Sequence, residues 1–177
     1  MRLLKTFSIF IIFICQASFS QQDTVNVDPS AFSIDYIMGP YLMVDHHLYK
    51  SVFMQGARIN YETGFAAYGI EYLVGMQEDE TGELGTTHSV SAKVDYFLLK
   101  NSLSRFRPYA YIGGGFFEFK DFSKDKLGVA FYTGLGSEFN FSSVVKGFIE
   151  GRYLNLGPLK LDGKNEIGVF WGIRVKF

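Results

Sequence analysis

The sequence predicts an all-β fold, an eight-stranded antiparallel up-and-down β-barrel that spans a membrane. Three observations predict it. Eight segments alternate between large apolar side chains and a second set that is small, polar or charged, which is the period of a β-strand. The apolar face carries almost no charge in seven of these segments. Short turns and longer polar loops join the segments alternately, as in a transmembrane barrel.

The composition agrees with a single strand-rich domain. The chain has 177 residues, of which 18% are aromatic, and it contains 19 glycines but only 4 prolines. The aromatic residues are mainly Tyr and Phe, which favour strands. The formal net charge of -1 gives no reason to expect nucleic acid as a partner.

Residues 1–20 have the composition of a secretory signal peptide. Basic residues near the start precede an almost wholly apolar run from Phe7 to Cys15, and Ser18 and Ser20 are small residues where signal peptidase reads the chain. This pattern predicts cleavage before Gln21. A retained membrane anchor fits less well, because the apolar run is about ten residues long and a spanning helix needs about 20.

Cys15 is the only cysteine, so we expect no disulfide in the exported chain. The residue before it, Ile14, is not small, which argues against lipid attachment at this cysteine. Residues 21–30 are polar and are interpreted as a periplasmic lead-in. Residues 31–177 are interpreted as the barrel.

The first four predicted strands each have one apolar face. In chain order these faces consist of Phe32, Ile34, Tyr36 and Met38; Phe53, Ala57, Ile59 and Tyr61; Ala66, Tyr68, Ile70, Tyr72 and Val74; and Val90, Ala92, Val94, Tyr96 and Leu98. The opposite faces consist of Ser33, Asp35 and Gly39; Met54, Gly56, Arg58, Asn60 and Glu62; Ala67, Gly69, Glu71, Leu73 and Gly75; and Ser89, Ser91, Lys93, Asp95, Phe97 and Leu99. Ile37 is the exception to the first pattern.

The fifth segment, Arg105 to Phe119, has no clear apolar face. Tyr109 and Tyr111 alternate with small and apolar residues, and we expect the two tyrosines to face outward. The Gly113–Gly115 run predicts a bend or bulge in this strand. It is not a phosphate-binding loop, since it lies in a strand pattern and no lysine follows it.

The last three segments alternate clearly again. Their apolar faces consist of Leu127, Val129, Phe131, Thr133, Leu135, Phe139 and Phe141; Val145, Ile149 and Tyr153; and Ile167, Val169, Trp171, Ile173, Val175 and Phe177. The predicted short turns are Tyr61–Gly64, Lys100–Ser104 and Ser142–Ser143, and the predicted longer loops are Tyr41–Lys50, Met76–Thr87, Glu118–Lys126 and Asn155–Asn165.

The distribution of charge decides which face is buried. A soluble eight-stranded barrel would turn its apolar residues inward and its charges outward. Here the apolar set is nearly free of charge and its aromatics gather near strand ends, as an interfacial girdle does. We therefore predict that lipid covers the apolar face and that a polar network fills the lumen. Its expected members are Arg58, Glu71, Lys93, Asp95, Glu138, Glu150, Arg152 and Arg174.

Two strands and the end of the sequence carry a resemblance to a known family. The segments Phe148–Tyr153 and Arg107–Gly115, together with Phe177, resemble the small outer-membrane β-barrel family related to the OmpA transmembrane domain and OmpX. The resemblance covers the whole mature chain and implies a location in the bacterial outer membrane. It also implies that Trp171 and Phe177 belong to the signal that the barrel-assembly machinery recognises.

No residue set predicts catalysis or metal binding. His46 and His47 are adjacent, so their side chains point opposite ways on an extended chain, and they and His88 are interpreted as solvated. Lipid A deacylases are also eight-stranded barrels, with a His and a Ser after a late Arg-Tyr pair. Here Arg152-Tyr153 is followed by neither. Lys93 with Asp95, and Glu150 with Arg152, are interpreted as pairs that neutralise each other.

The sequence therefore predicts a monomeric, non-enzymatic barrel in the outer membrane of a diderm bacterium, with no cofactor and no metal. We expect a structural role, or recognition of a ligand outside the cell through the long loops. Its expected partners are outer-membrane lipids and, during biogenesis, the barrel-assembly machinery. The alternatives are a narrow pore and, after it, a lipid A-modifying enzyme.

Overall fold

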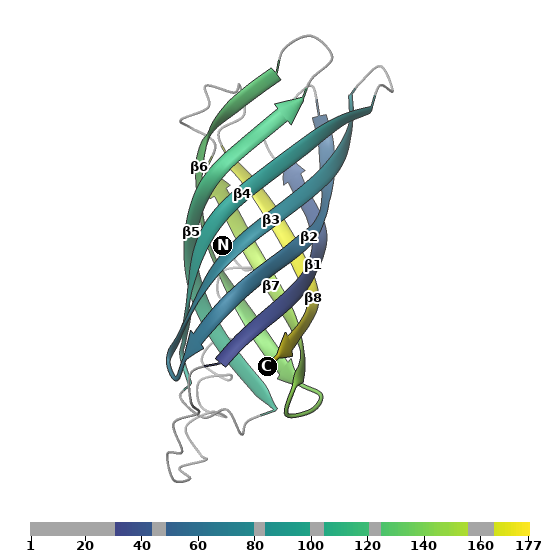
Figure 1. Cartoon of the computed structure of the whole chain (residues 1–177). Coiled ribbons are helices and arrows are strands. Elements are labelled where there is room, and N and C mark those ends of the chain that lie inside the picture. The colour runs from purple at the N-terminus through teal and green to yellow at the C-terminus, as the bar shows by residue number, and fades with distance from the viewer. Residues whose placement is uncertain (1–30, 44–48, 80–83, 100–104, 121–124, 156–164) are drawn as a thin grey trace, which may run out of the picture.

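The computed structural model describes residues 31–43, 49–79, 84–99, 105–120, 125–155 and 165–177. They form eight strands: β1 (Ala31–Met43), β2 (Tyr49–Thr63), β3 (Ala66–Asp79), β4 (Leu84–Phe97), β5 (Phe106–Lys120), β6 (Asp125–Asn140), β7 (Val145–Asn155) and β8 (Asn165–Lys176). Each strand pairs antiparallel with the next, and β8 pairs with β1 to close the barrel (Figure 1). This confirms the predicted eight-stranded up-and-down topology.

None of the described residue ranges forms a helix with the length and hydropathy that a membrane-crossing helix requires. The predicted signal peptide and lead-in, residues 1–30, lie outside the described residues.

The strand register closes the barrel with a shift of ten residues. The pairings lead from each strand to the next and finally back to β1. A path that begins at Ala31 returns to β1 at Tyr41, ten positions further along, through Glu62, Ala67, Asp95, Tyr111, Gly134, Arg152 and Gly168. Such a shift requires strands that tilt relative to the barrel axis, and Figure 1 shows this tilt.

Most strands are longer than the sequence pattern predicts, and β5 and β8 have the predicted length. The eight strands have 11 to 16 residues, whereas about 9 to 11 tilted residues suffice to cross a bilayer. Much of the predicted loops Tyr41–Lys50, Met76–Thr87 and Glu118–Lys126 is therefore strand, and the gaps there are 44–48, 80–83 and 121–124. These polar residues extend the ladders because their backbone groups still find partners across the strands.

We call the two ends of the barrel the turn end and the loop end. The turn end carries the connections 64–65, 98–105 and 141–144, and the loop end carries 44–48, 80–83, 121–124 and 156–164. The connection after β6 begins with a tight turn, in which the Ser142 side-chain oxygen accepts hydrogen bonds from the backbone N–H groups of Val144 and Val145.

The facing predicted for seven strands is confirmed at nearly every position. The large apolar residues assigned to the outer face are exposed, for example Ile70 at 67% and Ile59 at 59%, while Arg58 and Glu71 are fully buried. Ile37, the exception in the sequence pattern, faces the interior and is buried. Ala66, at the beginning of β3, is the assigned outer residue that is buried instead.

The outward facing predicted for Tyr109 and Tyr111 is wrong. Both tyrosines are buried inside the barrel, at 0% and 3% exposure. Glycines opposite them on β6 make the room: a Cβ atom on Gly136 would lie 2.5 Å from the Tyr109 ring, and one on Gly134 would lie 2.5 Å from the Tyr111 hydroxyl oxygen. The inward facing is therefore a steric fit between the two strands.

The bend or bulge predicted at Gly113–Gly115 is also absent. β5 pairs with β4 and β6 in unbroken register through all three glycines. Gly113 faces the Tyr132 ring on β6, where a side chain would collide with it, and Gly115 lies against the backbone of β4. These glycines therefore allow close packing inside a regular strand.

Candidate functional site

The barrel interior contains all eight residues that the sequence assigned to a polar network. Each is buried, with an exposure of at most 2%. They come from six strands: Arg58 on β2, Glu71 on β3, Lys93 and Asp95 on β4, Glu138 on β6, Glu150 and Arg152 on β7, and Arg174 on β8. The structure brings these residues together in the lumen through ion pairs that join strands far apart in the chain.

The central part of this network is built around Arg58. Its guanidinium lies 2.8 Å from Asp35 on β1 and 2.9 Å from Glu150 on β7. The ammonium group of Lys93 lies 2.5 Å from the same Glu150 carboxylate and 2.9 Å from Asp95. Because both cations share Glu150, the central cluster connects four strands.

A second cluster lies nearer the turn end. Arg174 donates hydrogen bonds to Asp35 at 2.8 and 2.9 Å, and also to Glu138. Lys146 donates to Glu138 at 3.1 Å. At the turn end, Glu62 accepts from Arg107 and lies 3.2 Å from the Lys176 ammonium group.

Arg152 forms the layer nearest the loop end. Its guanidinium donates to both carboxylate oxygens of Glu71, at 2.7 and 3.0 Å, which is the bidentate geometry of strong charge-assisted pairs. It also donates to the Tyr41 hydroxyl at 3.2 Å. The rings of Tyr132 and Phe170 lie 4.4 and 4.5 Å from its central carbon, within the range of cation–π attraction.

Comparison with known proteins shows the fold. No family model and no curated protein sequence matches the chain. Among solved structures, neisserial surface protein A matches with a TM-score of 0.63 and 14% identity, covering 86% of this chain and 100% of that one. The N-terminal β-barrel domain of Pseudomonas aeruginosa OprF matches with a TM-score of 0.61 and 16% identity, covering 83% and 97%.

The attachment invasion locus protein Ail of Yersinia pestis also matches, with a TM-score of 0.50, 19% identity and coverage of 84% and 97%. The chain has the fold of a small bacterial outer-membrane β-barrel. At these identities the comparison concerns the fold, which agrees with the resemblance seen in the sequence.

The barrel interior is more apolar at its loop end than the sequence analysis predicted. Charged residues fill the turn end and the middle of the lumen. Beyond Arg152, toward the loop end, the buried side chains are mainly apolar: Val52, Met54, Leu73, Phe117 and Leu154. The predicted polar filling thus describes only part of the lumen, because apolar residues on the inner face, such as Leu73, gather at one level.

Four members of the network were not predicted as such: Asp35, Glu62, Arg107 and Lys146. All four are buried and make ion pairs in the interior. Asp35, Glu62 and Lys146 alternate with outward-facing apolar residues in the sequence, and this alternation was enough to place them in the interior. Arg107 lies two and four positions before Tyr109 and Tyr111, so the wrong facing of those tyrosines hid its inward position.

Lys93 with Asp95, and Glu150 with Arg152, were interpreted as neutralising pairs. The members of each pair lie 2.9 and 3.3 Å apart, and each member also pairs with residues of other strands. These residues therefore belong to one extended network.

His88, the histidine in the described part of the chain, does not belong to this interior network. His88 lies on the outer side of β4, where its ring stacks on Tyr72 and its Nδ1 atom is 3.0 Å from the Tyr72 hydroxyl. His46 and His47 lie outside the described residues. In the described part of the chain, no group of three or more His, Cys, Asp or Glu side chains is arranged to hold a metal ion.

Proposed function

We propose that the protein is an integral, non-enzymatic barrel of the bacterial outer membrane with a structural or surface-recognition role. Residues 1–20 direct its export as a signal peptide and are then cleaved. The observation that carries this proposal is the separation of charge from the outer wall. Side-chain exposure is described for the strands except at residues 43, 49–51, 77–79, 84, 119–120 and 125–126. Within that part, no exposed strand residue is charged, and the exposed polar ones are Gln55, Thr86, Thr133 and Asn155.

The outer wall suits lipid and is unsuited to water. Among the described residues, 33 large hydrophobic side chains are exposed, 28 of them on the strands, far beyond the apolar patches of a few hundred Å² that soluble monomers tolerate. Inside, burial of a charge is costly unless the charge is paired. The interior ion pairs satisfy that condition, so this face assignment is energetically consistent in a membrane.

Aromatic residues at the turn end support a membrane interface there. Three pairs of rings from neighbouring segments lie in contact: Phe32 with Tyr61, Phe65 with Tyr96, and Phe106 with Phe139, with centroids 5.1 to 6.2 Å apart. All lie at strand ends or in the adjoining turns. Aromatic rings collect at the two borders of the hydrocarbon layer in outer-membrane barrels.

The filled lumen favours a closed barrel over the narrow pore. An eight-stranded barrel has space only for side chains, and here the Arg152–Glu71 layer is followed by an apolar layer toward the loop end. In planar bilayers we expect no discrete conductance steps, with a porin refolded by the same procedure as positive control. Reproducible single-channel openings would support the pore alternative instead.

The name of one similar structure raises a recognition hypothesis. Ail was crystallised with the heparin analogue sucrose octasulfate. The four connecting segments at the loop end of this chain, 44–48, 80–83, 121–124 and 156–164, contain five acidic and three basic residues. Their net negative charge argues against a polyanion as the ligand of this chain, so the proposal of surface recognition does not include sulfated glycans.

During biogenesis, the proposal includes recognition of β8 by the barrel-assembly machinery through Trp171 and Phe177. Their side chains are exposed on the outer wall, at 41% and 76%, and are available for contact. The mature barrel is proposed to be a monomer in contact with outer-membrane lipids.

The test is refolding of the chain without residues 1–20. Diluted from urea into detergent micelles, it should migrate faster on a gel unboiled than boiled. The full-length chain, expressed in cells with residues 1–20 in place, should fractionate with the outer membrane. A folded, monodisperse species in buffer without detergent would contradict the proposal. Mass analysis of lipid A from a deletion strain tests the enzyme alternative, for which we expect no change.

A further inference from the structure

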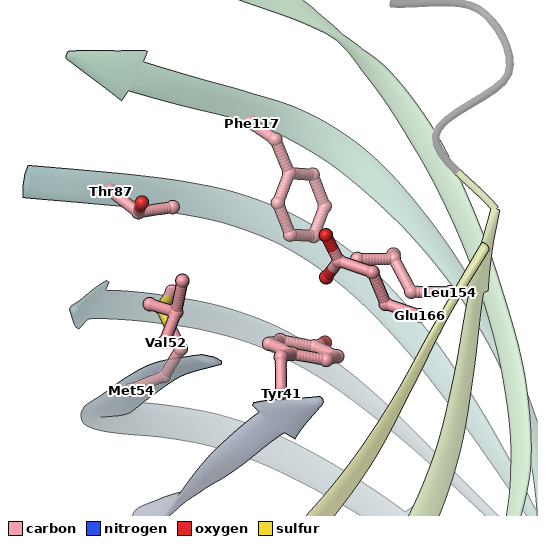
Figure 2. A pocket seen from close by; sticks show the side chains of 7 residues that line it. All are labelled: Tyr41, Val52, Met54, Thr87, Phe117, Leu154 and Glu166. Atoms are coloured by element: carbon pink, nitrogen blue, oxygen red, sulfur yellow. The ribbon is translucent and has the colours of Figure 1, made fainter. Parts of the chain in front are cut away.

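A cavity lies inside the barrel at its loop end. Its volume is about 200 Å³ including the open mouth, and its enclosed part has room for about one water molecule. The walls come from β1, β2, β4, β5, β7 and β8 and are largely apolar, with Met54, Phe117 and Leu154 among the lining residues. Figure 2 shows that one carboxyl group, that of Glu166, lies among these side chains, near the rings of Phe117 and Tyr41.

Glu166 is buried, and none of the other side chains that the structure describes is a partner for its carboxyl group. Its exposure is 3%, its Oε1 atom has no hydrogen-bond partner, and none of the ion pairs between described residues includes it. Other buried carboxylate oxygens without a hydrogen bond differ in this respect. Glu62 Oε2 lies 3.2 Å from the Lys176 ammonium group, and Asp95 Oδ1 lies 2.9 Å from that of Lys93.

Glu166 is the one described buried carboxylate of the interior that has no cation beside it; Lys176, which is slightly more exposed than the buried cations, lies beside Glu62 at the turn end. Among the described residues, six buried cations face seven buried carboxylates: Arg58, Lys93, Arg107, Lys146, Arg152 and Arg174 against Asp35, Glu62, Glu71, Asp95, Glu138, Glu150 and Glu166. The first six carboxylates take part in the ion pairs of the network. Burying an unpaired carboxylate in apolar surroundings is unfavourable, so the site gains from a positive charge supplied from outside.

We propose that this cavity binds the primary ammonium group of a small alkylamine, with Glu166 as its counter-ion. An –NH₃⁺ group is about the size of the enclosed space, and a short alkyl chain would lie against the apolar side chains of the lining, such as Val52 and Phe117. The rings of Tyr41 and Phe117 add cation–π attraction, which strengthens in desolvated sites. This inference goes beyond the proposed function and requires only the barrel fold.

The lining favours an amine over a metal ion. Hard cations such as Ca²⁺ require six to eight oxygen ligands and Mg²⁺ requires an octahedral set. The lining residues offer one carboxylate and the hydroxyl groups of Tyr41 and Thr87, and the Tyr41 hydroxyl already accepts a hydrogen bond from Arg152. An alkylammonium ion needs only the carboxylate and an apolar wall.

The test is an NMR titration of the ¹⁵N-labelled barrel, refolded in detergent micelles, with n-propylammonium chloride. A ligand of four non-hydrogen atoms cannot bind with a dissociation constant below about 40 μM, so the titration extends to millimolar concentrations. We expect saturable shifts of backbone amides at the loop end of β1, β5 and β8. Potassium chloride at equal ionic strength and 1-propanol, which has the same shape without charge, should produce no saturable shifts there.

Two variants make the test specific. Glu166→Gln should weaken propylammonium binding at least tenfold while leaving heat-modifiable migration intact. Glu62→Gln, the same change at the turn end of the same interior, should leave the affinity within twofold. The proposal is overturned if the Glu166→Gln barrel binds propylammonium equally well. It is also overturned if the native barrel shows no saturable shifts, which is the result expected if a lysine side chain of the same chain already pairs with Glu166. In either case the migration assay still reports separately on the membrane barrel.

Discussion

Arg152 and Glu71 illustrate how single residues hold this interior together. Their bidentate pair spans the lumen between β7 and β3, and both side chains are fully buried. A buried ion pair adds little net stability compared with an apolar pair, but loss of one partner leaves an uncompensated charge. The structural value of each residue therefore depends on the presence of the other.

We expect Arg152→Leu to lower the free energy of unfolding by about 3 to 5 kcal/mol, because Glu71 then keeps only Arg58 at 3.5 Å. The double variant Arg152→Leu/Glu71→Leu should recover most of this loss. Urea unfolding in lipid vesicles measures both. If the double variant loses as much free energy of unfolding as the two single variants together, the two side chains do not stabilise the barrel through their mutual ion pair.

The glycines of β6 act through the space that they leave. Gly136→Ala places a methyl group 2.5 Å from the Tyr109 ring, and overpacking of this kind costs about 1 to 3 kcal/mol. Gly151→Ala on β7 is the matched control, because a Cβ atom there meets only the Leu135 carbonyl oxygen, at 3.9 Å. In the same unfolding assay we expect destabilisation for Gly136→Ala alone, and equal values for the two variants would contradict the steric explanation.

Among the elements, the strands differ in how far their sequences reveal their facing. β3 and β8 have bulky apolar residues on one face and mostly small or charged residues on the other, with Leu73 and Phe170 as the exceptions, so alternation alone predicts them. β5 has aromatic or apolar residues on both faces, and its orientation is set by the glycines of β6. That information belongs to the pair of strands, and a reading of β5 alone cannot contain it.

The site was predictable to a similar extent. Arg58, Glu71 and Glu150 stand out because a charge between apolar residues has only one favourable side in a barrel. The partners of each charge were not predictable, because they depend on the barrel register. The sequence also could not show that Glu166 is unpaired. The register places Glu166 beside Phe117 and Leu154 at the loop end of the lumen, and its neighbours in the chain give no sign of this.

The outer face of β3 offers a direct test of the lipid boundary. Ile70 is 67% exposed at the fifth of the 14 positions of β3, inward of the aromatic residues at the turn end, and Ile70→Arg should cost about 2 to 4 kcal/mol in bilayers. Leu42→Arg, at the loop end of β1, should cost about 0 to 1 kcal/mol, because the bilayer border tolerates the charge. Equal costs for the two variants, measured by unfolding from lipid vesicles, would argue against a hydrocarbon layer at Ile70.

β8 allows assembly to be separated from stability. We expect Phe177→Ala to reduce the amount of barrel in the outer membrane several-fold in cells, while refolding in detergent stays unchanged, since the side chain is 76% exposed. Phe141→Ala is the matched control, because Phe141 is 71% exposed in a turn and lies outside the proposed signal. Equal loss for both variants would indicate a general membrane-anchoring effect and not a signal.

At the scale of the whole molecule, the barrel consists of an apolar wall around a graded interior. Paired charges occupy the turn end and the middle, and apolar side chains with the unpaired Glu166 occupy the loop end. The wall accounts for the proposed membrane location, and the filled interior accounts for the expected lack of conductance. The loop-end cavity is then the part of the lumen where an outside molecule can meet an unsatisfied charge.

The ten-residue shift of the register has a consequence for how such a chain can change in length. Side chains alternate with a period of two, so only an even offset keeps interior residues inside after a full circuit. Insertion or deletion of a single residue within the regular ladder would turn the remainder of that strand inside out unless a bulge absorbs it, as the register shift between Tyr49 and Val52 of β2 does near the loop end. We infer that gains and losses within the wall must come in pairs or be taken up by such a bulge, whereas the connections between strands can vary by any number.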